Sequence, residues 1–504
     1  MPQEGAVGYM KRKYGLAAAA LTLCLAVLTA LPVGAAGAGQ ASCYWYDKWG
    51  TPVTIPDACE LTGTVELATL TDRELKGITD AYVLSDGTMY VLDQTGAVLH
   101  LDAACGLIGM LELYAADGTP ETLSEPEGVF FDEKNDRLYI ADTGNHRILK
   151  ILPDGTVESV FTRPDNLTGA LEQLDYLPSK VVVDNAGRIY VVARNINMGI
   201  VVLDKNGRFI AYRGAPEVTL SLYDQFWRQF STQEQLERME THIPTEYNNI
   251  TIDSDSFLWG TISAIDDEDL ERTILTNDFS STVSPIKKLN LAGEDILRRK
   301  GLYPPVGDLT PKSLSAFGDV ALADCGIYTV LDTGKGRLFT YNDDGELLYV
   351  FGNIGDKHSD FKKPVAVSYS GDTLLVFDAG LNAIFRFEPS TYGALVLRAV
   401  RSYYNGDYTD SYTAWGEVLD YNSNLSLAYI GVGKAYFQQG DYEAAIECFR
   451  MAGDKENCSE AYRMIRDANV RRYFPWIAGG LGVLIVLLAI SGWIGKFRRY
   501  CRGE

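Results

Sequence analysis

A strand–turn–strand sequence motif recurs along the first four-fifths of the chain. In its clearest copy, Val129–Phe131 ends at Asp132, Leu138–Asp142 follows, and Ile148–Ile151 leads to the turn Asp154–Gly155. A unit of this kind cannot bury its apolar face alone, so copies must stack. The number of copies therefore decides the architecture.

Six copies of this motif can be aligned on one residue of the second predicted strand in each copy. The residues at that position are Tyr90, Tyr139, Tyr190, Trp259, Thr329 and Leu375. Most intervals are about 50 residues and two are about 70, with the apolar–polar alternation of half-buried antiparallel strands. Four-stranded units of this length indicate a β-propeller, so we predict a mainly β chain with a six-bladed β-propeller over residues 61–397. A β-helix is the structural alternative, but it expects shorter repeats.

The segment 61–70 precedes the first blade and also alternates well. We expect it to supply the outer strand of the last blade, which would close the ring and remove an exposed sheet edge. Residues 39–60 are expected to form an N-terminal extension before the propeller.

The two wide intervals hold insertions. Residues 220–241 show helical spacing with one apolar face, and further additions lie within 264–318. Additions to a rigid ring tend to lie on its surface, where function concentrates. The candidate partner or ligand contacts are Phe226, Trp227, Glu246 and Tyr247. The alternative is that the inserted helix merely packs on the outside of the propeller.

After the propeller the pattern changes period. The triplet Gly406–Tyr408 recurs as Gly440–Tyr442, and Gly433 and Phe449 fall where a tetratricopeptide repeat (TPR) places small and large residues. We predict short TPR-like helical repeats over residues 398–472, packed on the propeller and holding it off the membrane. A groove for a partner peptide is a further possibility.

Both ends of the chain predict a membrane location. Lys11–Lys13 precede an apolar run and a small-residue stretch, so residues 1–38 are predicted to be a secretory signal peptide, with an uncleaved anchor as the alternative. Residues 474–494 are uncharged, apolar and long enough to cross a bilayer as one transmembrane helix. Basic residues follow this span more densely than they precede it. We therefore expect residues 495–504 in the cytoplasm and the bulk of the chain outside the plasma membrane, a single-pass type I arrangement.

The charge of the chain excludes one class of partner. The net charge is −22 at pH 7, and the basic clusters lie at the two ends. An acidic surface repels nucleic acid, so no nucleic-acid partner is expected. A solvated acidic exterior is the simplest explanation of this charge.

Cysteine spacing leaves the disulfide status open. Cys43 and Cys59 could staple the N-terminal segment, and Cys448 and Cys458 could link neighbouring helices. Free buried thiols are the alternative, and the spacings match no zinc pattern. The cysteines concerned are Cys43, Cys59, Cys105, Cys325, Cys448 and Cys458.

One stretch carries a resemblance to a known family. Asp142–Ile148, which reads Asp-Thr-Gly-Asn-His-Arg-Ile, is the pattern of the NHL repeat and implies an NHL/TolB-like propeller. Further segments resemble membrane-anchored NHL-propeller proteins of Gram-positive bacteria, roughly from residue 44 to residue 500. These segments are 46–56, 243–249, 293–299 and 304–308. Members are typically found beside components of sugar-type ABC importers, which implies transporter or envelope proteins as partners.

Some six-bladed propellers are hydrolases or lyases that hold a metal in the central channel. In this chain the acids that follow the second strand recur in four copies, whereas catalytic groups should be unique, so turn stabilisation is the better account of them. These acids are Asp93, Asp142, Asp332 and Asp378. His146 lies in the repeat motif and is expected to be structural.

We therefore predict no catalytic residue, no cofactor and no metal site. The expected role is that of an extracytoplasmic, membrane-tethered binding or scaffold propeller, accessory to an ABC-type uptake system or an envelope complex. Its ligand could be a sugar, a peptide or another envelope protein. The alternative is a metal-dependent lactonase- or lyase-like propeller enzyme.

Overall fold

The computed structural model describes residues 43–47, 49–164, 175–194, 196, 198–214, 247–262, 284–300, 305, 307–308 and 315–502. All of them belong to one compact unit, Ser42–Glu504. The expected signal peptide (1–38) and the inserted helix (220–241) lie outside the described residues.

Three four-stranded antiparallel blades come first. Their strands are β4 (Ile78–Val83), β5 (Met89–Asp93), β6 (Val98–Leu101) and β7 (Leu107–Met110) in blade 1; β8 (Gly128–Asp132), β9 (Arg137–Asp142), β10 (Arg147–Ile151) and β11 (Val157–Phe161) in blade 2; β12 (Leu177–Val183), β13 (Ile189–Arg194), β14 (Ile200–Leu203) and β15 (Phe209–Arg213) in blade 3.

Three more blades follow. Within the described residues, their consecutive strands are β16 (Asn249–Ile252), β17 (Leu258–Thr261) and β18 (Ile286–Leu289) in blade 4; β19 (Phe317–Leu322), β20 (Tyr328–Asp332), β21 (Arg337–Tyr341) and β22 (Leu347–Phe351) in blade 5; β23 (Pro364–Ser370), β24 (Thr373–Asp378) and β25 (Ala383–Pro389) in blade 6. Short 3-10 turns occur at Leu67–Thr69, Thr143–Asn145 and Asp324–Gly326.

The first strands of the blades form a closed ring. Strand β4 contacts β8, β8 contacts β12, and the series continues through β16, β19 and β23 back to β4. The six-bladed propeller predicted from the repeats is confirmed. The six residues used to align the repeats all lie on the second strand of their blades.

The second strands owe their apolar sequences to this arrangement. Every residue of β5 and β20 is buried, because neighbouring blades cover both faces of each sheet. Outer strands such as β11 alternate between buried and exposed residues instead. The period-2 pattern therefore appears in the outer strands, and continuous apolar runs mark the inner ones.

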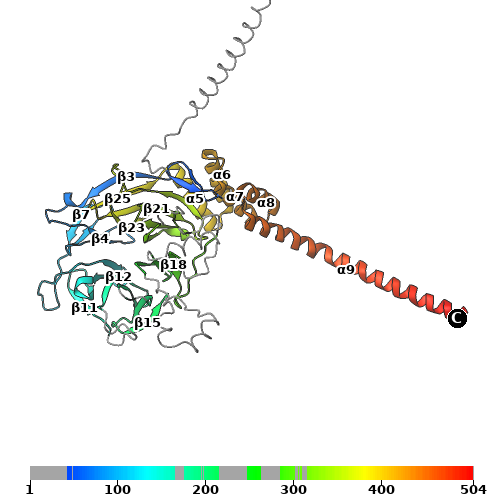
Figure 1. Cartoon of the computed structure of the whole chain (residues 1–504), viewed down its shortest axis with the longest axis horizontal. Coiled ribbons are helices and arrows are strands. Elements are labelled where there is room, and N and C mark those ends of the chain that lie inside the picture. Colours follow the sequence, from blue (N-terminus) through cyan, green and yellow to red (C-terminus); the bar gives the residue numbers. More distant parts are fainter. Residues whose placement is uncertain are drawn as a thin grey trace, which may run out of the picture. The chain divides into compact units, whose positions relative to one another are not determined.

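An N-terminal strand closes the ring, as the sequence predicts. Strand β3 (Cys59–Glu66) pairs with β25 as the outer strand of blade 6, and Val65 lies opposite Ile384. Figure 1 shows β3 beside β25, although the two strands are far apart in the sequence.

The expected N-terminal extension is also part of the propeller. Strands β1 (Tyr44–Tyr46) and β2 (Pro52–Thr54) add to blade 5 beyond β22, so that sheet has six strands. The Trp45 indole donates to the Leu347 carbonyl at 2.8 Å. We predicted a separate extension over residues 39–60. The described part of this segment instead forms two strands of blade 5 and the start of β3.

Helices begin directly after blade 6, before the boundary expected at residue 397. They are α5 (Thr391–Tyr404), α6 (Tyr408–Tyr421), α7 (Ser426–Gln439), α8 (Tyr442–Ala452) and α9 (Lys455–Arg502). The Ser390 hydroxyl caps α5 by accepting from the Gly393 amide. Consecutive helices pack on one another from α5 to α9.

Glycines of α7 allow α6 and α8 to approach it closely. A Cβ on Gly433 would lie 2.6 Å from the Phe449 ring, and one on Gly431 would lie 2.2 Å from the Trp415 indole nitrogen. The small-against-large packing expected from the TPR-like pattern is therefore present.

Helix α9 runs without a break from the helical repeats through the predicted span. It contains a stretch of mean hydropathy 2.3, none of it buried against the rest of the chain, and it could cross a membrane by its length and composition. Figure 1 shows α9 continuing from α8.

Candidate functional site

The repeated aspartates hold loops in place. Each one ends the second strand of its blade, is fully buried, and accepts an N–H from the loop that leads into the first strand. Asp142 accepts from the Ser124 amide at 2.7 Å, and Asp93 accepts from the Gly77 amide at 2.7 Å. The same contact joins Asp332 to Ala316 and Asp378 to Lys362. Stabilisation of turns and loops, the role predicted for these acids, is confirmed.

The NHL motif of blade 2 adds links to its surroundings. Arg147 donates to Asp142 at 2.8 Å and to Glu121 at 2.9 Å. His146 adopts a left-handed backbone (φ 57°), and its Nδ1 lies 3.1 Å from the Tyr176 carbonyl oxygen. The Thr143 hydroxyl donates to the Pro178 carbonyl, just inside blade 3. These partners give His146 the structural role expected for it.

One register position of the first strands lines the centre of the propeller. On the second strand of each blade, one residue directly precedes the repeated aspartate position, and the first-strand residue paired with it lies at this register position. In blade 1, for example, Asp80 pairs with Leu92, the residue before Asp93. In the order of the six blades, the residues at this position are Asp80, Gly128, Lys180, Asn249, Asp319 and Ala366. We call the four polar members, Asp80, Lys180, Asn249 and Asp319, the central polar ring.

The members of the central polar ring bind one another. Lys180 Nζ lies 2.7 Å from Asp80 Oδ1, which joins blades 3 and 1 across the centre. Asn249 Nδ2 donates to Asp319 at 2.6 Å. Each carboxylate also accepts an N–H from the next blade: Asp80 from Val129 and Asp319 from Val367. The ring therefore ties the blades together at their innermost strands.

Burial sets the electrostatics of this ring. It raises the pKa of Asp319 to about 6, the Lys180 charge opposes that rise, and the Asp80 charge adds to it. With two carboxylates and one ammonium, the central polar ring largely neutralises itself. Among the described residues, no group of three or more His, Cys, Asp or Glu side chains is arranged to hold a metal ion.

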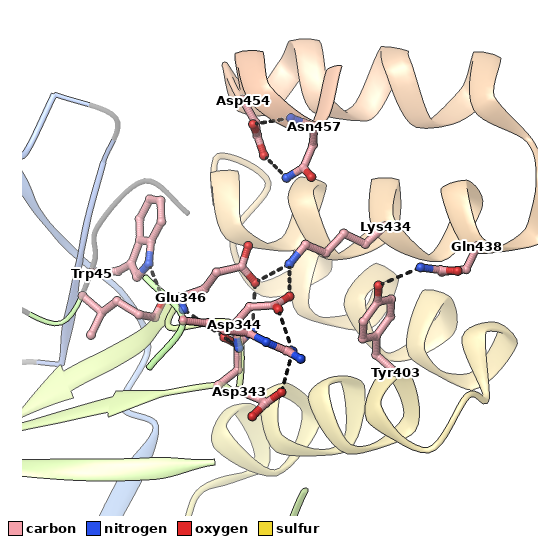
Figure 2. Close-up of polar contacts among 12 residues, drawn as sticks. Trp45, Asp343, Asp344, Glu346, Tyr403, Lys434, Gln438, Asp454 and Asn457 are labelled. Carbon is pink, nitrogen blue, oxygen red and sulfur yellow. Dashed lines mark hydrogen bonds and ion pairs between the residues drawn. The ribbon is translucent and has the colours of Figure 1, made fainter. Parts of the chain in front are cut away.

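A second polar cluster joins the helices to blade 5. Lys434 of α7 lies 2.7 Å from Asp344 and 2.9 Å from Glu346, in the turn between β21 and β22. Figure 2 shows the Lys434 side chain reaching from its helix to these two acids. Burial opposes the charge on Lys434, but the Glu346 and Asp344 carboxylates outweigh it and raise the pKa of the amine. We call Lys434, Asp344 and Glu346 the junction cluster.

A second cation docks the helices on two blades. Arg401 of α5 lies 2.8 Å from Asp324 of blade 5 and also pairs with Asp372 of blade 6. The expectation that the helices pack on the propeller is confirmed by these contacts.

A cavity of about 460 Å³ opens beside the junction cluster. Its walls come from the propeller (Lys300, Asp344), from α5 (Tyr403) and from the later helices (Gln438, Asn457). Gln438 donates to the Tyr403 hydroxyl at 3.3 Å across it, as Figure 2 shows. Donors, acceptors and aromatic edges line the same space.

Of the four contact residues predicted from the sequence, Phe226, Trp227 and Glu246 lie outside the described residues. Tyr247 is described and is only 7% exposed, with its hydroxyl donating to the Gly214 carbonyl at 3.0 Å. The expectation for Tyr247 is therefore corrected: its ring packs inside the propeller and presents little surface to a partner.

The sequence interpretation missed the central polar ring and the junction cluster. Aligning the first strands instead of the second would have placed Lys180 in register with Asp80 and Asp319. Lys434 is the single charged residue of α7, which is otherwise small, apolar or neutral. A lone lysine in such a helix is a signal for a buried ion pair.

The comparisons with known proteins agree with the repeat. Residues 123–151 match the model of the NHL repeat. No curated protein matches the chain in sequence. The chain is thus a six-bladed β-propeller that carries an NHL repeat at residues 123–151, followed by a helical segment and an apolar C-terminal helix.

Several solved structures are similar at a distance. Virginiamycin B lyase from Staphylococcus aureus is 11% identical with a TM-score of 0.40, covering 66% of this chain and 99% of that one. The WD40 β-propeller domain of Doa1 is 8% identical with a TM-score of 0.36, covering 66% and 98%. A protein of unknown function from Bacteroides thetaiotaomicron is 12% identical with a TM-score of 0.41, covering 68% and 80%. Similarities this low carry no argument about activity.

Proposed function

We propose that the chain is a binding or scaffold propeller held at the outer face of the plasma membrane by one span. An NHL-repeat β-propeller is a fold that supports binding, and α9 is apolar enough to cross a membrane. The observation that carries the proposal is the junction cluster: Lys434 fixes α7 to blade 5, and α7 leads through α8 to α9. A ring anchored this way suits presentation of a binding surface at a fixed place on the membrane.

The partners we infer are components of an ABC-type uptake system or an envelope complex. The resemblance to membrane-anchored NHL-propeller proteins supports this choice, and so does the polar cavity beside the junction cluster. The cavity suits a peptide segment of such a partner or a sugar that the partner transports. The TPR-like packing of α7 against α8 supports a surface for protein contacts.

In this proposal the chain binds its ligand and does not convert it. The repeated aspartates and His146 are committed to backbone and side-chain partners within the propeller. Lys180 and Asp80 of the central polar ring are committed to each other.

Affinity capture of the full chain from native membranes tests the proposal. The bait carries a tag on its C-terminal tail, and an unrelated single-span protein with the same tag is the control. We expect permease or binding-protein subunits of a transporter, or a defined envelope protein, to be enriched at least tenfold over the control. Recovery of the same proteins at equal yield with both baits would contradict the scaffold role.

A further inference from the structure

The N-terminal segment brings two cysteines to the boundary between blades 5 and 6. Cys43 directly precedes β1, the strand that extends blade 5. Cys59 is the first residue of β3, the strand that closes blade 6, and it lies opposite Pro389. The two residues therefore belong to sheets of neighbouring blades.

Backbone hydrogen bonds place Cys43 beside the segment that leads into Cys59. Tyr44 lies opposite Val350 in the antiparallel pair β1–β22, so Cys43 shares a sheet face with Tyr349. The Cys43 amide donates to the Asp57 carboxylate at 3.4 Å, and the Cys43 carbonyl accepts the N–H of Ile55 at 3.0 Å. The two cysteines thus lie close to each other, and the charge of Cys43 acts on Cys59.

Cys43 is buried and Cys59 is partly buried. Cys43 is 2% exposed and belongs to the hydrophobic core of blades 5 and 6, and Cys59 packs against the same core. Burial raises the pKa of the Cys43 thiol to about 12 and also raises that of Cys59. A buried thiol with a raised pKa reacts slowly. A disulfide between Cys43 and Cys59 must therefore form during folding, before the core around them is complete.

We propose that Cys43 and Cys59 form a disulfide in the mature protein and so lock the strand that closes the propeller. The inference rests on the proposed function, because disulfides persist outside the plasma membrane and are rare inside the cytoplasm. Cys43 and Cys59 are both free thiols in this structure, so the bond is an oxidation of the site shown.

The reaction is a thiol–disulfide exchange. The thiolate of one cysteine attacks a disulfide of an exported oxidant, either a protein or a small molecule, and releases one thiol. The second cysteine then attacks the mixed disulfide and releases the other thiol. Cys43 and Cys59 together lose two protons and two electrons, and the oxidant is reduced to a dithiol.

The bond would give the ring a covalent closure. Strand β3 holds blade 6 through its pairing with β25, and β1 holds blade 5 through β22 and the Trp45 indole. A bond between Cys43 and Cys59 would keep both strands in place if either sheet frayed. It also restricts the unfolded chain, which is how a disulfide mainly stabilises.

The test maps the thiols of the full chain purified from native membranes in the presence of N-ethylmaleimide. After denaturation and digestion without reductant, mass spectrometry should find Cys43 and Cys59 in one linked pair of peptides. Cys105 and Cys325 should carry the maleimide. A Cys59→Ser variant should melt a few degrees lower. Cys105→Ser is the matched control, because Cys105 is also buried: its midpoint should still fall on addition of reductant, whereas the midpoint of Cys59→Ser should not respond.

Maleimide on both Cys43 and Cys59 of the wild-type protein would overturn the inference, whether or not the variants fold. Surface labelling of a Lys205→Cys variant in intact cells separates the two possible failures. Labelled Lys205→Cys with free Cys43 and Cys59 would refute only the disulfide. Lys205→Cys that is labelled only in broken cells would refute the outward location as well.

Discussion

The Lys434 ammonium of α7 lies 2.9 Å from the Glu346 carboxylate in the turn between β21 and β22. The two side chains are 14% and 6% exposed, so this ion pair is largely removed from water. Such a pair is favourable only while both charges are present, because either charge left alone in the interior loses its hydration without compensation. The attachment of the helices to blade 5 therefore depends on Lys434.

We predict that Lys434→Met releases the helices from the propeller. The substitution leaves Glu346 buried without its cation, which costs about 3 kcal/mol. Limited proteolysis within residues 398–455 should accelerate roughly a hundredfold, provided that the helices detach and dock again faster than the protease cleaves them. Arg466→Met is the matched control, because the pair of Arg466 with Asp467 is 68% and 50% exposed. Equal cleavage rates for both variants would refute the role of the junction cluster.

The helix packing makes a second prediction with its own control. Gly433→Ala places a methyl group 2.6 Å from the Phe449 ring and should destabilise the helical segment by about 1–3 kcal/mol. Gly416→Ala, on α6, meets nothing within 4 Å and should stabilise by up to about 1 kcal/mol through helix propensity. Thermal melts followed by circular dichroism at a helix-sensitive wavelength compare the two variants. The opposite order of midpoints would contradict the observed packing.

Asp319 predicts a pH dependence of stability. Burial raises its pKa from 3.8 to about 6, so the folded chain binds this proton more tightly than the unfolded chain does. Its contribution is therefore fully present below about pH 4 and is lost as the pH rises through about 6. From pH 4 to pH 7, the unfolding free energy of wild type should fall by about 3 kcal/mol relative to Asp319→Asn.

Chemical denaturation of both proteins across this pH range measures that difference. The other charged or polar groups facing Asp319 are Lys180, Asp80 and Asn249, and all three are the same in the two proteins. A gap between wild type and Asp319→Asn that does not change with pH would contradict the buried environment of Asp319.

The repeated aspartates predict a loss of stability without a loss of binding. Asp142→Ala removes the acceptor of the Ser124 amide and the partner of Arg147, and should cost about 2–4 kcal/mol. Asp154→Ala, at an exposed turn where the side chain accepts only from the Thr156 amide, should cost less than about 1 kcal/mol. Denaturation midpoints give the comparison. Partner capture that fails with a fully folded Asp142→Ala variant would show a role for Asp142 beyond structure.

The second strands made the blades predictable from the sequence. Their apolar runs ending at Asp93 or Asp142 recur because every blade buries this strand on both faces. The closing role of β3 followed from its alternation and from the need to cover a sheet edge.

Other features depend on pairs that are distant in the sequence. Strand β1 is three residues long, and only its pairing with β22, about 300 residues away, makes it part of blade 5. The Lys180–Asp80 and Lys434–Glu346 pairs likewise join segments whose proximity comes from ring closure and helix docking. Tyr247 was misjudged because an aromatic residue near an insertion gives no sign of which way its ring points.

Cysteine labelling of intact cells tests the central claim most directly, since every proposed role requires the propeller to lie outside the membrane. Lys205→Cys lies in the exposed turn between β14 and β15, and Arg498→Cys lies near the end of α9. A membrane-impermeant maleimide is applied to each variant, with wild type as background. We predict that Lys205→Cys reacts in intact cells and that Arg498→Cys reacts only after permeabilisation. The reverse pattern, or reaction of both variants only after permeabilisation, would contradict a tethered propeller on the outer face.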